Sequence, residues 1–344
     1  MPAHSATGMT DCDTFLFKTM IRPIFLCSLL ILALTACQQK PAAAAEETPT
    51  DSVPTFCADS AMHTLKAQCA FGPRIMNSEA HDKCGEYIAQ KFRDYGAEVT
   101  LQQADARGWD GTVYHMTNII ASVNPKAASR ILICAHWDSR PWADNDPDEK
   151  NHKTPILGAN DGASGVSVML ELARQLQLKQ PAIGVDFICF DAEDCGVPTW
   201  ANQDDDNSWC LGSQYWSANP HKANYKPRYG VLLDMVGGQG ATFYQEGFSK
   251  RYAQNIVNKV WQAARDAGYA GYFPMEDGGY VTDDHVPMNE VARIPTVDII
   301  PYYPNGDSSF GPTWHTVNDT PENIDAATLN AVGQTMMQLI YQEK

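Results

Sequence analysis

The sequence predicts an α/β protein with a mixed, mostly parallel central sheet that has helices on both faces. Strand-like and helix-like segments alternate along the chain, and several strand-like segments are apolar almost throughout, as in residues 131–134. Such alternation is typical of strands joined by helices, and near-continuous apolar strands indicate a sheet that is buried on both faces. With 344 residues, of which 44% are hydrophobic, the chain is long and apolar enough for one large core.

Hydrophobic periodicity and helix-terminating residues give the order of the elements. Ser78 begins a helix whose apolar residues recur every three or four positions until Gly96 ends it. Three further helices are expected, at residues 165–178, 250–267 and 324–342. Strands are expected at residues 99–102, 118–123, 130–135, 185–191, 231–236 and 296–300.

The N-terminal residues have the layout of an export signal. Arg22 precedes an apolar run at residues 24–34 that is too short to span a bilayer comfortably, and small residues and a cysteine follow in Leu34-Thr35-Ala36-Cys37. This string resembles a bacterial lipobox, in which the cysteine is lipidated after cleavage. The alternative is an ordinary signal peptide that is cut near Ala36, with Cys37 incidental.

Three segments are therefore predicted. Residues 1–37 are a signal peptide with a lipobox, residues 38–55 are a flexible tether rich in Ala, Glu, Thr and Pro, and residues 56–344 are a single domain. We expect an exported lipoprotein on the periplasmic side, held at the membrane by lipid on Cys37. The sequence leaves open which membrane this is and whether the protein forms oligomers.

Charge and cysteine usage exclude two classes of protein. The chain has 25 basic and 41 acidic residues, which argues against nucleic acid as a partner because phosphate binding needs a clustered basic surface. The seven cysteines beyond the tether show no paired CxxC spacing, so a structural zinc knuckle is not expected. Cys195 and Cys210 flank one polar loop and are candidates for a disulfide in an oxidising compartment.

Long polar segments follow the predicted strands and carry histidine and acidic residues. In open α/β sheets, ligands collect beyond the carboxyl ends of the strands, so these segments are expected to share one pocket. Alone, each residue has an ordinary explanation; Asp161, for example, stands in Asn-Asp-Gly, where turn or helix-cap aspartates are common. Together the segments offer the nitrogen and oxygen ligands that zinc prefers. The residues in question are His136, Asp161, Glu193, Asp194, Asp234 and His315.

These strings, in this order, resemble the co-catalytic zinc aminopeptidase family and, within it, the glutaminyl-peptide cyclotransferases. The resemblance extends from about residues 71–74 to the last helix, and it identifies residues 56–344 as one catalytic domain. Three strings favour the cyclotransferase branch: residues 283–287, residues 294–301 and Trp314-His315-Thr316. The resemblance implies that the N-terminal glutamine of peptides and proteins is converted to pyroglutamate with release of ammonia.

The resemblance also implies a metal site. Asp161, Asp194 and His315 would hold one Zn²⁺, although the cyclotransferases usually have Glu where Asp194 stands. An aspartate is shorter by about one C–C bond, roughly 1.5 Å, so either the backbone lies closer to the metal or Asp194 binds differently. His136 and Asp234 match positions that bind the second zinc in two-metal aminopeptidases, and they are assigned as a possible second site or as supporting residues.

Catalytic and substrate-binding roles follow from the same resemblance. Glu193 would carry the proton between the attacking amine and the departing ammonia, and Asp283 would hydrogen-bond one of these nitrogens. Trp200 and Trp314 would form walls of the pocket, although packing alone is the commoner role of such residues. Asp298 stands where some animal cyclotransferases carry a histidine, and it is expected to support Asp283 at the substrate.

Two other functions fit the same residues. A zinc-dependent aminopeptidase would use the same pocket with two zinc ions and Glu193 as the base for hydrolysis of N-terminal residues. A binding lipoprotein would keep the fold with a degenerate site, but the complete set of acidic residues argues against it.

Overall fold

The central sheet has the mixed, mostly parallel arrangement that the sequence predicts. In the computed structural model, which describes residues 52–201, 203 and 205–344, six strands lie in the order β1-β2-β4-β3-β5-β6. Strands β4, β3, β5 and β6 pair with one another in parallel, whereas β1 pairs with β2, and β2 with β4, in antiparallel fashion. The strands are β1 (Glu98–Arg107), β2 (Val113–Val123), β3 (Arg130–His136), β4 (Gly184–Phe190), β5 (Gly230–Leu233) and β6 (Thr296–Ile299).

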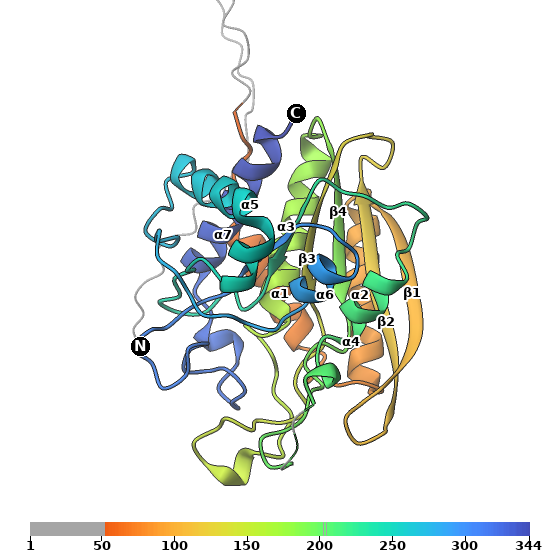
Figure 1. The fold of residues 1–344 in the computed structure, drawn as a ribbon, viewed down its shortest axis with the longest axis vertical. Coiled ribbons are helices and arrows are strands. Elements are labelled where there is room, and N and C mark those ends of the chain that lie inside the picture. The colour runs from red at the N-terminus through yellow and green to blue at the C-terminus, as the bar shows by residue number, and fades with distance from the viewer. Residues whose placement is uncertain (1–51, 202, 204) are drawn as a thin grey trace, which may run out of the picture. The chain divides into compact units, whose positions relative to one another are not determined.

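Helices cover both faces of this sheet (Figure 1). Alternate residues of the strands face opposite sides, so Ile131 and Ile133 belong to the large core, whereas Leu132 packs with Trp216 and Met288 on the other face. The large core includes residues of α1 (Ala58–Cys69), α2 (Glu79–Asp94), α3 (Ala163–Leu178), α5 (Gly247–Asp266) and α7 (Ala326–Gln342). The smaller core includes residues of α4 (Leu211–Ala218) and α6 (His285–Glu290).

The sequence patterns missed α1 and placed the end of β5 too late. The buried face of α1 is partly polar, because Gln68 donates to the Ser167 hydroxyl at 2.8 Å, so its apolar periodicity is weak. β5 was expected to reach residue 236 but ends at Leu233, and Met235 then adopts a left-handed conformation with φ +50°. This turn leaves Asp234 directly after the strand.

The chain is held to the domain slightly earlier than predicted. Residues 52–55 were assigned to the tether, yet Lys179 donates to the Ser52 carbonyl at 2.9 Å and Gln334 to the Pro54 carbonyl at 3.2 Å. The predicted signal peptide, Cys37 and the rest of the tether lie outside the described residues. Among the helices that the structure describes, none combines the length and the apolar character needed to cross a membrane.

Close packing of α3 on the sheet positions the start of that helix. A Cβ atom on Gly165 would lie 2.2 Å from the Leu233 carbonyl oxygen and 2.8 Å from the Ala135 Cβ, both of which belong to strands. Only glycine therefore allows the first turn of α3 to approach β3 and β5 this closely.

We expect Gly165→Ala to lower the free energy of unfolding by about 1–3 kcal/mol, because overpacking a tight contact forces backbone shifts. Gly271→Ala is the matched control, since nothing lies within 4 Å of a Cβ at that position. Urea denaturation of both variants measures the difference, and equal stabilities would contradict the packing argument.

A second buried contact fixes the segment that carries Asp283. Glu246 caps α5 by accepting from the amides of Phe248 and Ser249 at 2.8 and 2.6 Å. The same carboxylate accepts from the Val281 amide at 3.1 Å and lies 3.0 Å from His285 Nε2. Burial opposes ionisation of Glu246, but His285 and the capping amides outweigh burial and lower its pKa to about 2.

Because the pKa of Glu246 is lower in the folded than in the unfolded state, its ionised form stabilises the protein above about pH 4.5. This contribution is lost as the pH falls towards 2. The free energy of unfolding of wild type minus that of Glu246→Gln, from urea titrations at several pH values, is therefore expected to shrink below pH 4.5. A difference that stays constant with pH would contradict this assignment.

Candidate metal centre

The five candidate metal-binding side chains come from separate segments that meet at the carboxyl edge of the parallel strands. His136 is the last residue of β3, Asp161 lies just before α3, and Asp234 follows β5. Asp194 follows β4, and His315 lies in the long loop between β6 and α7. All five are at least nine-tenths buried. The structure thus brings together residues that lie up to 179 positions apart, from 136 to 315.

One group consists of Asp161, Asp194 and His315. His315 Nε2 lies 3.2 Å from Asp194 Oδ1 and 3.6 Å from Asp161 Oδ2, and one ligand atom from each residue lies within 4.8 Å of the others. Tetrahedral zinc with ligands at 2.0–2.2 Å separates them by about 3.3–3.6 Å. Among the described residues, no hydrogen-bond partner reaches Asp161 Oδ2 or Asp194 Oδ2. Spacing, donor type and unpaired oxygens all fit a metal ion.

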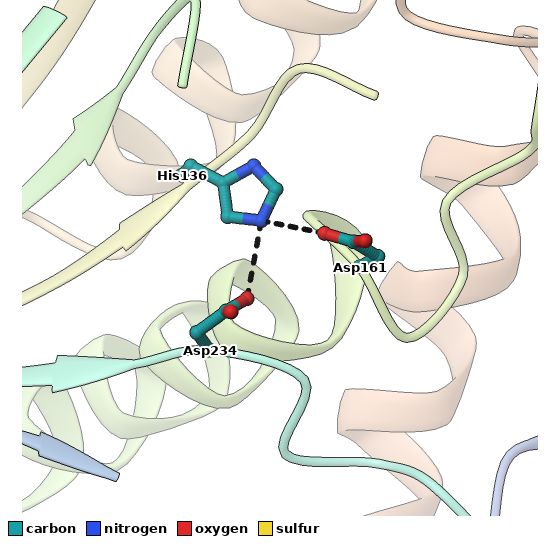
Figure 2. Close-up of side chains that lie close together, drawn as sticks. All are labelled: His136, Asp161 and Asp234. Atoms are coloured by element: carbon teal, nitrogen blue, oxygen red, sulfur yellow. Dashed lines mark hydrogen bonds and ion pairs between the residues drawn. The ribbon is translucent and has the colours of Figure 1, made fainter. Parts of the chain in front are cut away.

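The other group consists of His136, Asp161 and Asp234 (Figure 2). His136 Nε2 lies 3.0 Å from Asp161 Oδ1 and 3.1 Å from Asp234 Oδ1, so Asp161 belongs to both groups. His136 Nε2 and Asp234 Oδ1 have the geometry of a hydrogen bond. A proton on Nε2 therefore accounts for that contact without a metal ion.

Neighbouring groups hold the loop of Asp161 rigidly. The Asp319 carboxylate accepts from the amides of Asn160 and Asp161 at 2.7 and 3.0 Å. Gly162 has a φ of +99°, and a Cβ there would lie 2.3 Å from the Asp138 carbonyl oxygen. The turn expected from the Asn-Asp-Gly sequence is therefore present, and its function is to aim Asp161 at the two histidines.

Asp138 fixes the backbone of the other acidic ligand. Its two carboxylate oxygens accept from the amides of Glu193 and Asp194, each at 3.1 Å, and Oδ1 lies 3.5 Å from His136 Nδ1. Asp138 therefore lies beside the histidine and also holds the backbone of the acidic pair.

A cavity of about 260 Å³ opens beside the metal groups, and Glu193 and Asp283 both line it. Burial raises the pKa of Glu193 well above its usual range; the charge of His136 opposes this shift, whereas those of Asp194 and Asp283 add to it. Burial and the charge of Asp234 raise the pKa of Asp283 to about 7. Asp283 is therefore suited to exchange protons near neutral pH, and the carboxyl group of Glu193 is a weaker acid than usual.

The aromatic residues differ from the prediction at one position. Trp314 lines the cavity, with its ring stacked on His315 at 4.0 Å between centroids. Trp200 does not line it; its ring packs edge-on against Trp142 at 5.9 Å, and 36% of the residue is exposed. Trp200 therefore lies outside the lining of this cavity, and its contact with a substrate stays a prediction. Trp209, for which no role was predicted, lines the cavity.

Asp298 does not have the place at the substrate that the sequence predicted. Asp298 is fully buried and outside the cavity lining, so it does not touch a ligand there; it lies in one group with Asp283 and His285. Its support of Asp283 stays a prediction.

Cys195 and Cys210 are free thiols rather than a disulfide. Cys195 lies 3.8 Å from Asp138 Oδ2, and the Cys210 thiol donates to Glu193 Oε1 at 3.4 Å.

If Asp161, Asp194 and His315 hold one metal ion per chain, the Asp161→Ala variant should bind none, because one of the three ligands is missing. The Asp234→Asn variant should still bind one ion per chain, because Asp234 belongs only to the group of His136. Elemental analysis after dialysis measures the content. Two ions in the wild type, or an empty Asp234→Asn variant, would contradict this assignment.

Comparison with known proteins gives relatives over most of the chain. Bacteroides thetaiotaomicron glutaminyl cyclase bound to N-acetylhistamine is 52% identical, with a TM-score of 0.84 and a match covering 85% of this chain and 100% of that one. A leucine aminopeptidase precursor from the same organism is also 52% identical, with a TM-score of 0.83 and coverage of 85% and 99%. Glutaminyl-peptide cyclotransferase of Drosophila melanogaster is 25% identical over 279 residues, which are 74% of this chain and 73% of that protein.

The family model described as Peptidase family M28 matches residues 118–340, which include all five candidate metal ligands. Since this match spans more than half of the chain, the protein belongs to Peptidase family M28.

Proposed function

We propose that this protein is a zinc-dependent glutaminyl-peptide cyclotransferase, which converts the N-terminal glutamine of peptides and proteins to pyroglutamate and ammonia. The observation that carries the proposal is the pair of carboxyl groups of Glu193, which is partly buried, and Asp283, which is buried; both line one small cavity beside the group of Asp161, Asp194 and His315. The similarity to glutaminyl cyclase over the full length of that chain supports it.

The reaction requires a proton carrier and no external water. The α-amine of the substrate attacks its own side-chain amide carbon, so one C–N bond forms within the substrate and the bond to the amide nitrogen breaks. Glu193 accepts the proton from the attacking amine and delivers it to the nitrogen that leaves as ammonia. The raised pKa of Glu193 favours this exchange, because a strongly acidic carboxyl would not hold the proton between the two steps.

Asp283 has a position from which it can hydrogen-bond the substrate nitrogen. One of its carboxylate oxygens lies within 4.8 Å of a ligand atom of Glu193, so both acids can face a single amine. Asp283 Oδ2 has no hydrogen-bond partner among the residues that the structure describes, although Asp283 is only 3% exposed. Such an unpaired buried acceptor is costly unless a ligand group completes it.

When bound by Asp161, Asp194 and His315, Zn²⁺ would supply Lewis acidity for the side-chain carbonyl of the substrate glutamine. The walls of the cavity confine the substrate. Trp209, Phe310 and Trp314 line the cavity, and their rings limit the space around the folded glutamine side chain. When the substrate is held in this folded conformation, its amine lies next to its own side-chain amide, and this proximity lowers the barrier to the reaction.

The alternative is an aminopeptidase, and the similarity to a leucine aminopeptidase precursor is consistent with it. That chemistry uses two metal ions and an activated water. The hydrogen bond between His136 Nε2 and Asp234 Oδ1 needs no second metal ion, and the relatives include a glutaminyl cyclase and a glutaminyl-peptide cyclotransferase; both observations favour the cyclotransferase.

The test is mass spectrometry of matched peptides with N-terminal Gln or Leu, incubated with wild type and with Glu193→Gln. Wild type should remove ammonia from the Gln peptide and leave the Leu peptide intact. Glu193→Gln should lower the rate by about 10²–10⁴-fold, the usual contribution of a general acid–base group. Release of free leucine or glutamine would support the aminopeptidase instead, and an unchanged rate in the variant would remove Glu193 from the mechanism.

A further inference from the structure

A buried arginine lies behind the candidate metal group. Arg140 is 1% exposed, and its Nε and Nη2 donate to the two carboxylate oxygens of Asp144, each at 2.7 Å. Its Nη1 reaches Asp194 at two points, the carbonyl oxygen at 3.2 Å and Oδ1 at 3.3 Å. One guanidinium therefore holds both the main chain and the side chain of a metal-binding residue.

The same arginine is connected to the histidine of the group. Asp144 Oδ1 lies 3.5 Å from His315 Nδ1, on the side of the ring opposite to the Nε2 that faces Asp161 and Asp194. The Asn145 amide also donates to the His315 carbonyl at 3.1 Å. Asn145 Nδ2 lies 3.4 Å from the same ring nitrogen, Nδ1, so a carboxylate and an amide together limit the rotation of the metal-binding imidazole.

Two indole rings flank the guanidinium. The Arg140 Cζ lies 4.6 Å from the centroid of Trp209 and 5.3 Å from that of Trp142. A planar guanidinium that stacks on aromatic rings and makes a two-point contact with a carboxylate has little freedom to rotate. Its contacts therefore set the separation between Asp194 and the Asp144–His315 pair.

The contacts of Arg140 explain how the short side chain of Asp194 can reach a metal ion. An aspartate reaches about 1.5 Å less far than a glutamate, yet Asp194 Oδ1 lies 3.2 Å from His315 Nε2, a spacing suitable for a shared ion. The backbone of Asp194 is held from two sides, by Asp138 at its amide and by Arg140 at its carbonyl.

We propose that Arg140 is a positioning residue that holds Asp194 and His315 at metal-binding distance and so allows an aspartate to serve as ligand at position 194. The proposal rests on the metal group of the proposed function, but it does not depend on which reaction that group performs. The proposal also predicts that metal affinity falls, and does not rise, when Arg140 is replaced. The positive charge of Arg140 repels a cation, so an arginine that acted through charge alone would weaken metal binding, and its removal would strengthen it.

Arg140→Lys and Arg140→Met separate charge from geometry, because lysine keeps the charge but lacks the planar fork. Both variants are expected to bind zinc about 10–100-fold more weakly than wild type, the usual effect of losing a partner that orients a metal ligand. The measurement is the zinc dissociation constant by competition with a chelator, without substrate. Excess zinc should restore much of the turnover in both variants.

Arg130→Lys is the matched control. Arg130 makes an equivalent two-point contact with buried Asp186, at 2.7 and 2.6 Å, but it begins β3, whereas His136 ends it. Six residue steps along a strand place this pair about 20 Å from the metal group. Arg130→Lys should lose stability in urea denaturation with zinc affinity within twofold of wild type.

Unchanged or tighter zinc binding in Arg140→Met would overturn the proposal, as would an equal loss of affinity in Arg130→Lys. If the Arg140 variants do not fold, Asp144→Asn tests the same contact and should also weaken zinc binding. A chain that binds zinc as predicted but does not cyclise glutamine would contradict the proposed function and leave this inference standing.

Discussion

The central constraint in this molecule is the mutual repulsion of carboxylates that share a buried space at the end of the sheet. Asp161, Asp194 and Asp234 are nine-tenths or more buried, and Glu193 lines the same cavity. Their nitrogen-bearing neighbours are His136, His315 and Arg140. Burial strengthens like-charge repulsion because the surroundings screen it poorly. A cation in one group and a proton in the other would relieve that repulsion, and the same electrostatic field raises the pKa of Glu193. In the proposed function, metal binding and proton transfer are therefore consequences of one arrangement of charges.

The fold creates this arrangement by ending strands beside one another. Parallel β3, β4 and β5 each deliver an acid or a histidine at the carboxyl edge, and α3 begins at the same edge because Gly165 allows it to approach the sheet. Rigidity then comes from contacts behind the reactive groups. Asp138 holds the amides of residues 193 and 194, Asp319 holds the Asp161 loop, and Glu246 holds the segment that leads to Asp283.

The residues at strand ends could be predicted from the sequence, because the strands themselves are clear in the hydrophobic pattern and topology places their ends together. Positions inside irregular loops could not. Arg140 and Asp144 lie in a segment without periodicity, and nothing in the sequence indicates that one guanidinium reaches both Asp144 and Asp194. Trp200 and Trp209 show the same limit, since the path of a long loop decides which indole faces the cavity. Helix α1 was missed because Thr64 and Gln68 occupy its buried face.

Anomalous X-ray diffraction from crystals of the protein, at energies on either side of the zinc absorption edge, distinguishes a zinc ion from a proton in each group. We expect one strong zinc peak within bonding distance of Asp161, Asp194 and His315, and hydrogen-bond distances without a peak between His136 and Asp234. A peak confined to the His136 group, peaks in both groups, or carboxylates of Asp161 and Asp194 turned away from each other with no ion between them would contradict this expectation.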